Sequence, residues 1–414
     1  MKSLFEVLKD RGYIYQTTNE EQVKKLCDGK PTTIYFGIDP TADSLHIGHC
    51  FPMFVLKYFQ ERGHKIIILL GGATAMIGDP TGKTDMRKMV THEFIESNLE
   101  QIKKIVGKFL CLDGDNPVHF VNNYDWFKDI NYVGFMREIG VHFNVNTMLA
   151  TDAYSRRLEQ GGLTFFEMGY MLMQAYDFVY LNKEFGCRLQ IGGSDQWANI
   201  LAGANLGRKL SIAEGKDAET FQALTCPLLL NAEGKKMGKT EKGALWIMKE
   251  KTSPYEFYQA FYNQSDASVE HFLKVLTRLS LEEIEEIMKG DIRDAKRRMA
   301  FEVTKFIHGE EDAKSAQETA VNLFNNNGFG DLSNAPTYEV SQQDLGVKTI
   351  IDISVESGIC SSKSDARRTI EQGGLSVNGQ KVNEIAQVLS NNDFEDGYAL
   401  IKKGKKNFIK IIVK

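Results

Sequence analysis

The stretch Tyr35-Phe-Gly-Ile-Asp-Pro-Thr-Ala-Asp-Ser-Leu-His46-Ile-Gly-His49 decides the fold of this chain. Residues 33–38 are mainly β-branched and aromatic, which predicts a buried strand, and the Asp-Pro-Thr that follows is typical of a turn. Asp43 or Ser44 is expected to cap the helix that comes next. A helix that directly follows a strand points its free N–H groups at the crevice above the sheet, where they favour an anion.

Two histidines mark the start of this predicted helix. His46 and His49 stand three residues apart, so on a helix both imidazoles can reach the same ligand. Gly48 between them has no side chain, which lets a large ligand approach the backbone. A metal half-site is one alternative, but no Cys, Glu or third His lies nearby in the sequence. Two unrelated histidines on a solvated helix are the other alternative.

The composition is that of an ordinary soluble globular protein. The 414 residues suffice for about two to four domains, and 42% of them are hydrophobic and 25% charged. The net charge of −5 argues against a generic nucleic-acid-coating protein, although residues 345–414 hold 11 Lys and Arg against 8 Asp and Glu. Six scattered cysteines without a C-x-x-C pair indicate neither a disulfide framework nor a zinc site.

No targeting or membrane segment is apparent. Residues 1–10 are expected to form a small amphipathic helix with acidic residues, which fits neither a secretory signal nor a transit peptide. The longest apolar run, about residues 66–77, is too short and too rich in glycine to span a bilayer. A cytoplasmic protein is therefore predicted.

Further apolar segments predict a parallel sheet. Residues 65–70 form a continuous apolar run that ends in two glycines, as in a strand buried on both faces. Residues 118–121 and 188–191 are further strand candidates, each followed by a loop and a helical pattern. Strands that alternate with helices predict a doubly wound, Rossmann-like α/β sheet, whose ligands bind at the carboxyl ends of the strands.

The loop from Gly78 to Thr84 resembles a phosphate-binding P-loop only superficially. Gly78 and Gly82 are separated by three residues, whereas the P-loop pattern requires four. Asp79, expected at the end of a buried strand, is the better functional candidate, since its carboxylate can bind an amino group.

Two segments in the middle of the chain carry polar residues on apolar elements. Tyr170, Gln174 and Asp177 recur at i, i+4 and i+7, which predicts one polar stripe on an otherwise apolar helix. Buried polar groups need partners, which a polar ligand supplies, although a helix edge turned to water would show the same pattern. After a predicted strand, Gly193-Ser-Asp195-Gln196 brings backbone close to a ligand and directs two polar side chains at the cleft.

The remaining chain holds a lysine-rich loop, helices and a basic tail. Residues 231–243 are dense in lysine and glycine, usually the mark of a solvated loop. Periodic apolar residues predict helices from 253 to about 327, and 325–336 has the composition of a linker. In the tail, a short basic helix with Lys363, Arg367 and Arg368 is followed by a strand and an Asn-Gly hairpin turn. The basic side of this helix suits phosphates, although a merely solvated helix face would look the same.

These motifs resemble one known family in their order. His46-Ile-Gly-His49 resembles the HIGH signature of class I aminoacyl-tRNA synthetases, and Lys236-Met-Gly-Lys239-Thr240 resembles their KMSKS loop, with Gly and Thr in place of the two serines. Tyr35, the Tyr170-x-x-x-Gln174-x-x-Asp177 stripe and Gly193-Ser-Asp195-Gln196 resemble the tyrosine branch in its bacterial form. The tail resembles a small RNA-binding module named after a ribosomal small-subunit protein. Together these segments cover almost the whole chain.

The resemblance implies a role for each matching residue. The substrate phenol is expected to bind Tyr35 and Asp177, and its α-amino group Asp79, Tyr170 and Gln174. The other expected contacts are Gly37, Asp39, Gly48, Gly193, Asp195, Gln196 and Lys239 for ATP or the adenylate, Thr41, His46, His49, Lys236, Lys239 and Thr240 for the triphosphate, and Lys363, Arg367 and Arg368 for RNA.

The implied reaction has two steps. Tyrosine and ATP form tyrosyl-adenylate and pyrophosphate, and the tyrosyl group then passes to the terminal adenosine of tRNA(Tyr). Because the substrate carboxylate is already a nucleophile, activation needs donors placed where charge develops on the phosphates. The resemblance also implies Mg²⁺ on the phosphates without a dedicated protein metal site, and a homodimer formed near residues 127–143. No editing domain is expected, because a site that hydrogen-bonds the phenol rejects phenylalanine by itself.

Two other functions remain open at this stage. One is a tryptophan-specific enzyme of the same fold, although such relatives typically lack both the tail module and the Tyr35/Asp177 pair. The other is an RNA-binding or regulatory protein built on a degenerate synthetase body, which the intact motifs disfavour.

Five segments are predicted along the chain. These are a catalytic domain that binds ATP and tyrosine (1–230), a mobile loop and its connection (231–250), an α-helical domain on the anticodon side (251–327), a linker (328–344) and the RNA-binding domain (345–414).

Overall fold

The computed structural model describes most of the chain. The described residues are 2–81, 91–230, 234, 236–237, 244–325, 336–394, 397–404 and 407–414. Contacts divide them into two compact units, one formed by Met1–Met248 with Ala267–Glu286 and the other by Lys249–Asp266 with Ile287–Lys414. No helix within the described ranges is both long and apolar enough to cross a membrane.

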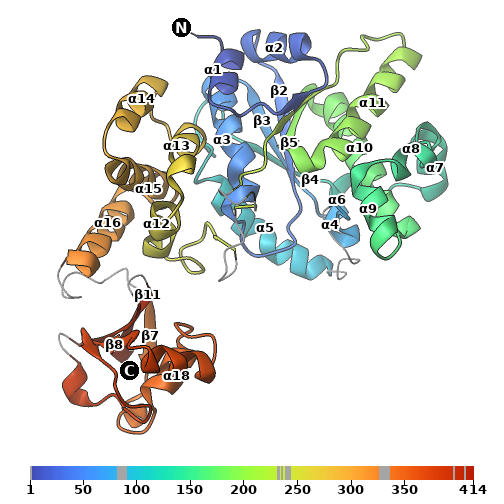
Figure 1. Ribbon diagram of the computed structural model, residues 1–414. Coiled ribbons are helices and arrows are strands. Elements are labelled where there is room, and N and C mark those ends of the chain that lie inside the picture. Colours follow the sequence, from blue (N-terminus) through green and yellow to red (C-terminus); the bar gives the residue numbers. More distant parts are fainter. Residues whose placement is uncertain are drawn as a thin grey trace. The chain divides into compact units, whose positions relative to one another are not determined.

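The first unit is built on a six-stranded sheet (Figure 1). Its strands, in spatial order, are β1 (Gln16–Thr17), β6 (Gln222–Cys226), β5 (Cys187–Gly193), β2 (Thr33–Ile38), β3 (Lys65–Leu70) and β4 (His119–Asn122). All neighbours are parallel except β1, which pairs antiparallel with β6. The predicted Rossmann-like sheet is therefore confirmed, with an additional short antiparallel edge strand.

Helices cover both faces of this sheet. Figure 1 shows α3 (Ile47–Glu61) on one side and α10 (Phe165–Phe185) with α11 (Trp197–Ala213) on the other. Tyr35, Ile67 and Leu69 from the central strands pack against Phe178 and Leu181 of α10. The remaining helices of the unit are α1 (Leu4–Asp10), α2 (Glu20–Asp28), α4 (Thr74–Ile77), α5 (His92–Val106), α6 (Tyr124–Phe127), α7 (Tyr132–Glu138), α8 (Val145–Leu149), α9 (Asp152–Gln160) and α13 (Val269–Leu276).

The start of α3 differs from the prediction. Neither Asp43 nor Ser44 caps this helix; the N-cap is His46, whose Nδ1 accepts a hydrogen bond from the backbone N–H of His49 at 3.3 Å. Ser44 is buried and its hydroxyl instead lies 3.4 Å from the carbonyl of Leu45. An imidazole nitrogen thus takes the place that a hydroxyl or carboxylate usually occupies at an N-cap.

The long helix α10 carries the predicted polar stripe. Thr164 and Glu167 form a capping box at its N-terminus, and Gly186 ends it in the left-handed conformation, with φ 63°. Tyr170 and Asp177 are buried and Gln174 is partly buried, so this stripe faces the interior and the alternative of a helix edge turned to water is wrong.

The second unit contains helices and a small sheet. The α-helices that precede its C-terminal sheet are α12 (Pro254–Tyr262), α15 (Ile292–His308) and α16 (Glu310–Asn325), and α14 (Leu281–Lys289) spans the boundary between the two units. The C-terminal sheet has the order β7 (Thr337–Val340), β11 (Asn407–Val413), β10 (Tyr398–Lys403), β8 (Leu375–Val377) and β9 (Gln380–Lys381).

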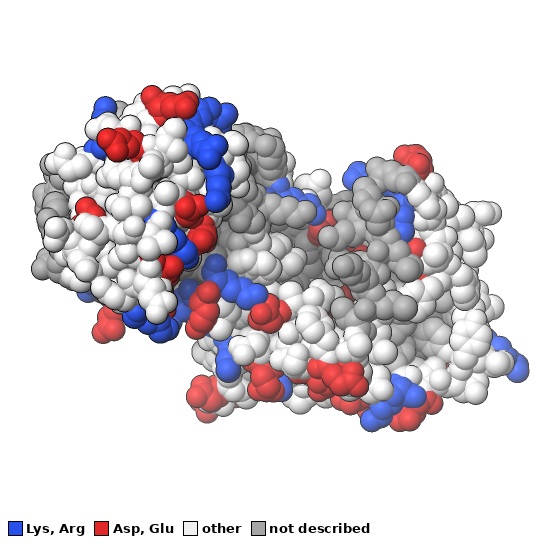
Figure 2. Space-filling model, turned by 90° about the horizontal axis from the view of Figure 1, so that it is seen from below, with Lys and Arg blue, Asp and Glu red and all other residues white. Residues whose placement is uncertain are grey.

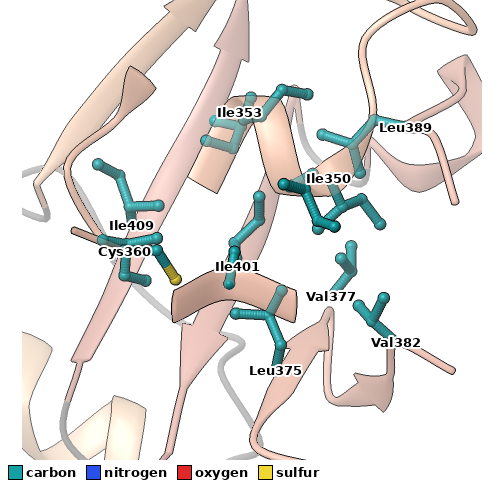
Figure 3. Close-up of a cluster of buried hydrophobic side chains, with 14 of the residues drawn as sticks. Ile350, Ile353, Cys360, Leu375, Val377, Val382, Leu389, Ile401 and Ile409 are labelled. Carbon is teal, nitrogen blue, oxygen red and sulfur yellow. The ribbon is translucent and has the colours of Figure 1, made fainter. Parts of the chain in front are cut away.

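The C-terminal module has its own hydrophobic core (Figure 3). Ile350 and Ile353 of α17 (Ile350–Glu356) pack with Leu375, Ile401 and Ile409 of the sheet. The predicted hairpin is confirmed, because Asn378 and Gly379, at φ 48° and 81°, join antiparallel β8 and β9. The basic helix predicted before it is α18 (Lys363–Glu371).

Candidate active site

Most of the predicted site residues gather at the carboxyl ends of the parallel strands. Asp39 follows β2, and the pair Gly71-Gly72 follows β3. Asn123 comes directly after β4, and residues 193–196 end β5 and lead into α11. A parallel sheet brings these positions to one edge, where ligands of doubly wound folds bind.

One part of the site is a buried phenol next to a buried carboxylate. Tyr35 is 1% exposed and Asp177 2% exposed. The carboxylate of Asp177 accepts hydrogen bonds from Asn123 Nδ2 at 3.1 Å and from Trp126 Nε1 at 3.0 Å. Within the described residues, the Tyr35 hydroxyl has no hydrogen-bond partner. A buried hydroxyl without a partner is costly, and a polar ligand at this place would remove that cost.

Burial dominates the electrostatics of this part. It raises the pKa of Asp177 well above the ordinary value, and nearby Asp39 adds to the increase, while the bonds from Asn123 and Trp126 oppose it. Burial likewise raises the pKa of the Tyr35 phenol, with Asp177 as the second cause. The Tyr35 phenol is therefore a neutral donor at physiological pH.

A second group of polar side chains joins residues from four segments. Asp39 accepts hydrogen bonds from Tyr170 OH and Thr74 Oγ1, both at 2.8 Å. Asp79 accepts from Gln196 Nε2 at 2.6 Å. Asp79 follows the short helix α4 and not the strand itself, so its predicted place directly at a strand end is wrong.

Two glutamines near this group carry buried oxygens without partners. In the part of the chain that the structure describes, Gln174 Oε1 and Gln190 Oε1 accept no hydrogen bond. Gln190 lies opposite Tyr35 in the register of β5 and β2 and is 2% exposed. Together with the Tyr35 hydroxyl, these oxygens indicate that a polar ligand belongs among these side chains.

At the same edge of the sheet, polar side chains lie close against two glycines, Gly71 and Gly72. An added Cβ on Gly71 would collide with the side chains of Asp39 and Thr74, and one on Gly72 would collide with Asn122. Glycine at these positions leaves room for the carboxylate of Asp39 to be held in place.

The two histidines stack on each other at the start of α3. The ring centroids of His46 and His49 lie 3.6 Å apart, with 22° between the ring planes. Thr41, the third residue predicted here, donates its backbone N–H to the carbonyl of Asp39 at 2.8 Å. Because His46 is the cap, its ring lies at the very end of the helix, where the free N–H groups point.

The lysine-rich segment lies against this histidine pair. A Cβ added to Gly48 would stand 2.8 Å from the carbonyl oxygen of Met237 and 3.2 Å from the His46 ring. Beside Met237, Lys236 forms an ion pair with Asp195 at 2.9 Å. Lys239 and Thr240 lie outside the described residues. The described part of the segment thus connects the two predicted signatures.

A further strand-like contact fixes the chain that follows the loop. Ile47 donates its N–H to the carbonyl of Leu245 at 3.1 Å, and Ile247 donates to Leu45 at 3.0 Å. His46 and Trp246 face each other in this short antiparallel bridge. The chain on the C-terminal side of the lysine-rich segment is therefore anchored directly to the histidine motif.

The predicted RNA-contacting residues lie on the surface of α18. Lys363, Arg367 and Arg368 are all exposed. Lys363 pairs with Asp352 at 2.7 Å, and Arg368 lies 3.4 Å from Asp365. Figure 2 shows that Lys and Arg are interspersed with Asp and Glu on the face seen there.

Sequence reasoning missed several residues of the site. Asn123, Trp126 and Thr74 hold the two central carboxylates, and Gln190 lies beside Tyr35. Asn123 follows a strand at the functional edge of the sheet, so its position was a usable signal. Trp126 carried none, because its indole reaches Asp177 only through the packing of α6 against α10.

Comparisons with known proteins agree along the whole chain. The family described as tRNA synthetases class I (W and Y) matches residues 28–325. The family described as the tyrosine–tRNA ligase SYY-like C-terminal domain matches residues 328–411. A tyrosine–tRNA ligase of Clostridium botulinum is 50% identical over 414 residues, which is 99% of each chain. One of Clostridium perfringens is 49% identical over 416 residues and all of both chains.

A solved structure matches the fold of about three quarters of the chain. It is a C-terminally truncated mitochondrial tyrosyl-tRNA synthetase of Aspergillus nidulans, with 32% identity and a TM-score of 0.69. The match covers 78% of this chain and 95% of that one.

Proposed function

The chain belongs to the class I tRNA synthetases of the tryptophan and tyrosine group and is a tyrosine–tRNA ligase, and from this we propose how its residues share the reaction. The family that the motifs predicted is confirmed. The substrates of the proposed reaction are L-tyrosine, ATP with Mg²⁺, and tRNA(Tyr).

The observation that carries the assignment of tyrosine is the buried Tyr35 hydroxyl, which has no partner among the described residues, beside the buried Asp177 carboxylate. We propose that the substrate phenol binds between these two groups. Phenylalanine would leave both groups desolvated and unpaired, which is the physical basis of strong rejection. Asn123 and Trp126 keep Asp177 in place for this contact.

The second polar group suits the other end of the amino acid. We propose that Asp79, Tyr170 and Gln174 bind the α-ammonium group, and that Gly37, Asp39, Gly193, Asp195 and Gln196 contact the adenylate. The hydrogen bonds from Tyr170 to Asp39 and from Gln196 to Asp79 support a single connected site, since each proposed subsite shares a bond with the other.

Charge stabilisation supplies the chemistry of activation. The carboxylate of tyrosine attacks the α-phosphate and displaces pyrophosphate, so no general base is required. We propose that Thr41, His46, Gly48 and His49, together with Lys236, Lys239 and Thr240, stabilise the negative charge that grows on the phosphates. The contact between Gly48 and Met237 supports joint action, because it brings the described loop residues next to the imidazoles.

Magnesium enters this scheme only as part of the nucleotide substrate. Across the described ranges, no three His, Cys, Asp or Glu side chains come together in a way that could hold a metal ion. We propose that Mg²⁺ arrives on the phosphates of ATP.

Three further proposals concern partners and location. Lys363, Arg367 and Arg368 are proposed to contact tRNA phosphates. A homodimer is proposed through the region near residues 127–143, where Tyr132, Val133 and Val141 are 64%, 63% and 71% exposed. Since five of the six free cysteines are buried and Cys111 is exposed, a reducing cytoplasm is the proposed location.

Amino-acid-dependent exchange of pyrophosphate into ATP, without tRNA and with each of the twenty amino acids, tests this function. Tyrosine alone is expected to support exchange, and Asp177→Ala is expected to abolish it. Exchange with tryptophan and none with tyrosine would indicate the tryptophan enzyme. A folded chain that binds RNA tightly and exchanges with no amino acid would indicate the regulatory alternative.

A further inference from the structure

A buried ion pair lies at the base of the polar stripe on α10. The side chains of Arg157 and Glu167 are 5% and 2% exposed, and Arg157 Nη2 lies 3.0 Å from Glu167 Oε1. By contrast, surface pairs such as Lys2 with Asp10 remain about half in solvent. A buried pair is costly to desolvate, and the removal of one partner leaves an uncompensated charge in the interior.

Glu167 joins two helices through a single carboxylate. Its Oε1 accepts from Nε and Nη2 of Arg157, at 3.2 and 3.0 Å. Its Oε2 accepts from the N–H and the hydroxyl of Thr164, at 3.0 and 2.8 Å, and so completes the capping box of α10. The same side of α9 makes a second contact, from Tyr154 OH to the carbonyl of Met168 at 3.3 Å. The first turn of α10 is thus clamped to α9 (Figure 1).

The ion pair and the proposed tyrosine contacts share one helix face. Glu167, Tyr170, Gln174 and Asp177 follow each other at intervals of three or four residues, so their side chains lie along one line on α10. Tyr170 and Gln174 are the members next to Glu167. Asp177 lies farther along the helix and is held separately by Asn123 and Trp126. A shift of the first turn would therefore move the amino-group contacts more than the phenol contacts.

Tyr154 of α9 also lies near Asp79, the other residue proposed to bind the amino group. Burial raises the pKa of the Tyr154 phenol, and electrostatic repulsion from Asp79 raises it further. Tyr154 packs with Met148 and Met171 and is 1% exposed. α9 therefore packs against α10 through Tyr154 as well as through Arg157.

We propose that Arg157 and Glu167 are positioning residues for the amino end of the tyrosine site: their ion pair sets the place of Tyr170 and Gln174 relative to the substrate ammonium group. The proposal rests on the proposed role of the α10 stripe and deepens it. Neither residue touches the substrate.

A pair of ligands separates this role from a general effect on folding. L-Tyrosine and 3-(4-hydroxyphenyl)propanoate share the phenol, but the latter lacks the amino group. Dissociation constants of both are measured by equilibrium dialysis with the full chain and with Arg157→Met, Arg157→Lys and Glu167→Gln. Glu167→Gln keeps an oxygen that can cap α10, and Arg157→Lys keeps the positive charge. The test therefore does not depend on Arg157→Met alone. Arg156→Met is the matched control, because Arg156 is the exposed neighbour on the same helix.

The expected result is selective. Arg157→Met and Glu167→Gln weaken the binding of tyrosine by about tenfold, as expected from a slightly misplaced contact, while the binding of the propanoate stays within about twofold. Arg157→Lys falls between these variants and the unaltered chain, and Arg156→Met changes neither constant. Equal weakening of both ligands, or unchanged tyrosine binding in a folded variant, would overturn the positioning role. If the unaltered chain binds no tyrosine, the proposed function itself fails.

Discussion

At the scale of single residues, the proposed phenol site combines a neutral donor, Tyr35, with a buried acceptor, Asp177. The burial that raises the pKa of Tyr35 also keeps its proton available for a hydrogen bond. Asn123 and Trp126 hold the Asp177 carboxylate by two hydrogen bonds, so the proposed site offers the substrate hydroxyl an acceptor that is fixed in place. Selectivity for a hydroxyl then follows from the cost of leaving such groups unpaired.

The change Tyr35→Phe tests this balance. It removes the proposed hydrogen bond to the substrate hydroxyl, worth about 0.5–1.5 kcal/mol net, so kcat/KM for tyrosine in pyrophosphate exchange should fall by about two- to tenfold. Because the unpaired hydroxyl is gone, kcat/KM for phenylalanine should stay constant or rise. An unchanged value for tyrosine would show that Tyr35 does not contact the phenol.

A second prediction at this scale concerns the buried His64. Its Nδ1 accepts the backbone N–H of Thr32 at 3.2 Å, and burial is the main reason that its pKa lies below the ordinary 6.5. The folded state therefore binds its proton more weakly than the unfolded state does. The stability from His64 is complete above about pH 6.5 and is lost as the pH falls toward the lower folded pKa.

Urea unfolding at about pH 7.5 and about pH 5.5 measures this contribution. The unaltered chain should lose more free energy of unfolding between the two values than His64→Asn does. Equal losses in the two proteins would assign the pH dependence to other groups.

At the scale of elements, helix α3 unites two distant parts of the chain. Its cap is His46, its first turn holds Gly48, and the backbone of Met237 lies against that glycine. The carbonyl of Leu245 and the N–H of Ile247 then tie the following chain to the same helix end. The proposed triphosphate site is therefore an assembly of one helix terminus and one loop, and close packing at Gly48 decides their distance.

Gly48→Ala tests this assembly. The added methyl group would lie 2.8 Å from a backbone oxygen, which cannot move as a flexible side chain could. The segment with Lys236 should be displaced, and the rate of exchange should fall by about tenfold or more, while tyrosine binding changes little. Gly290→Ala is the control, since its Cβ would be 3.4 Å from the nearest atom, the carbonyl oxygen of Ile287. Unaltered exchange in Gly48→Ala would exclude a role for this contact.

At the scale of the whole molecule, hydrogen bonds tie the N-terminal segment of the first unit to residues 274–279 of the same unit. Arg11 is 5% exposed and donates to the carbonyl oxygens of Lys274, in the last turn of α13, and of Thr277 and Leu279, which follow that helix. Tyr13, fully buried, donates to Val275 at 2.8 Å. A cation at the C-terminus of a helix meets the negative end of its dipole, so residues far apart in sequence hold one another.

Arg11→Met should therefore destabilise the folded unit without changing the chemistry. The loss of charged hydrogen bonds to buried carbonyls is expected to lower the free energy of unfolding by about 2–3 kcal/mol, measured by urea denaturation. The rate of pyrophosphate exchange at about 25 °C should stay close to that of the unaltered chain, because this temperature lies well below a typical unfolding midpoint. Lys9→Met removes a mainly exposed ion pair with Glu20 and should leave the midpoint nearly unchanged.

The sequence by itself determined the class of sheet, the family and the order of the motifs. Alternation of apolar strands and helices is a local pattern, and residues 33–38 form the predicted strand with the predicted bounds. The stripe from Tyr170 to Asp177 also follows from helical spacing alone, since side chains three and four residues apart share a face. These features depend on neighbouring residues, so they can be recognised before the chain is folded.

Only the tertiary structure decided how the marked residues are held. His46 is the cap because α3 begins at Ile47, and Trp126 reaches Asp177 across 51 positions of sequence. The bond from Tyr170 to Asp39 and the burial of Arg157 with Glu167 likewise join segments that no local pattern connects. Hydrogen bonds and desolvation act over a few ångströms in space, so such partners are set by the packing of helices on the sheet and not by their spacing along the chain.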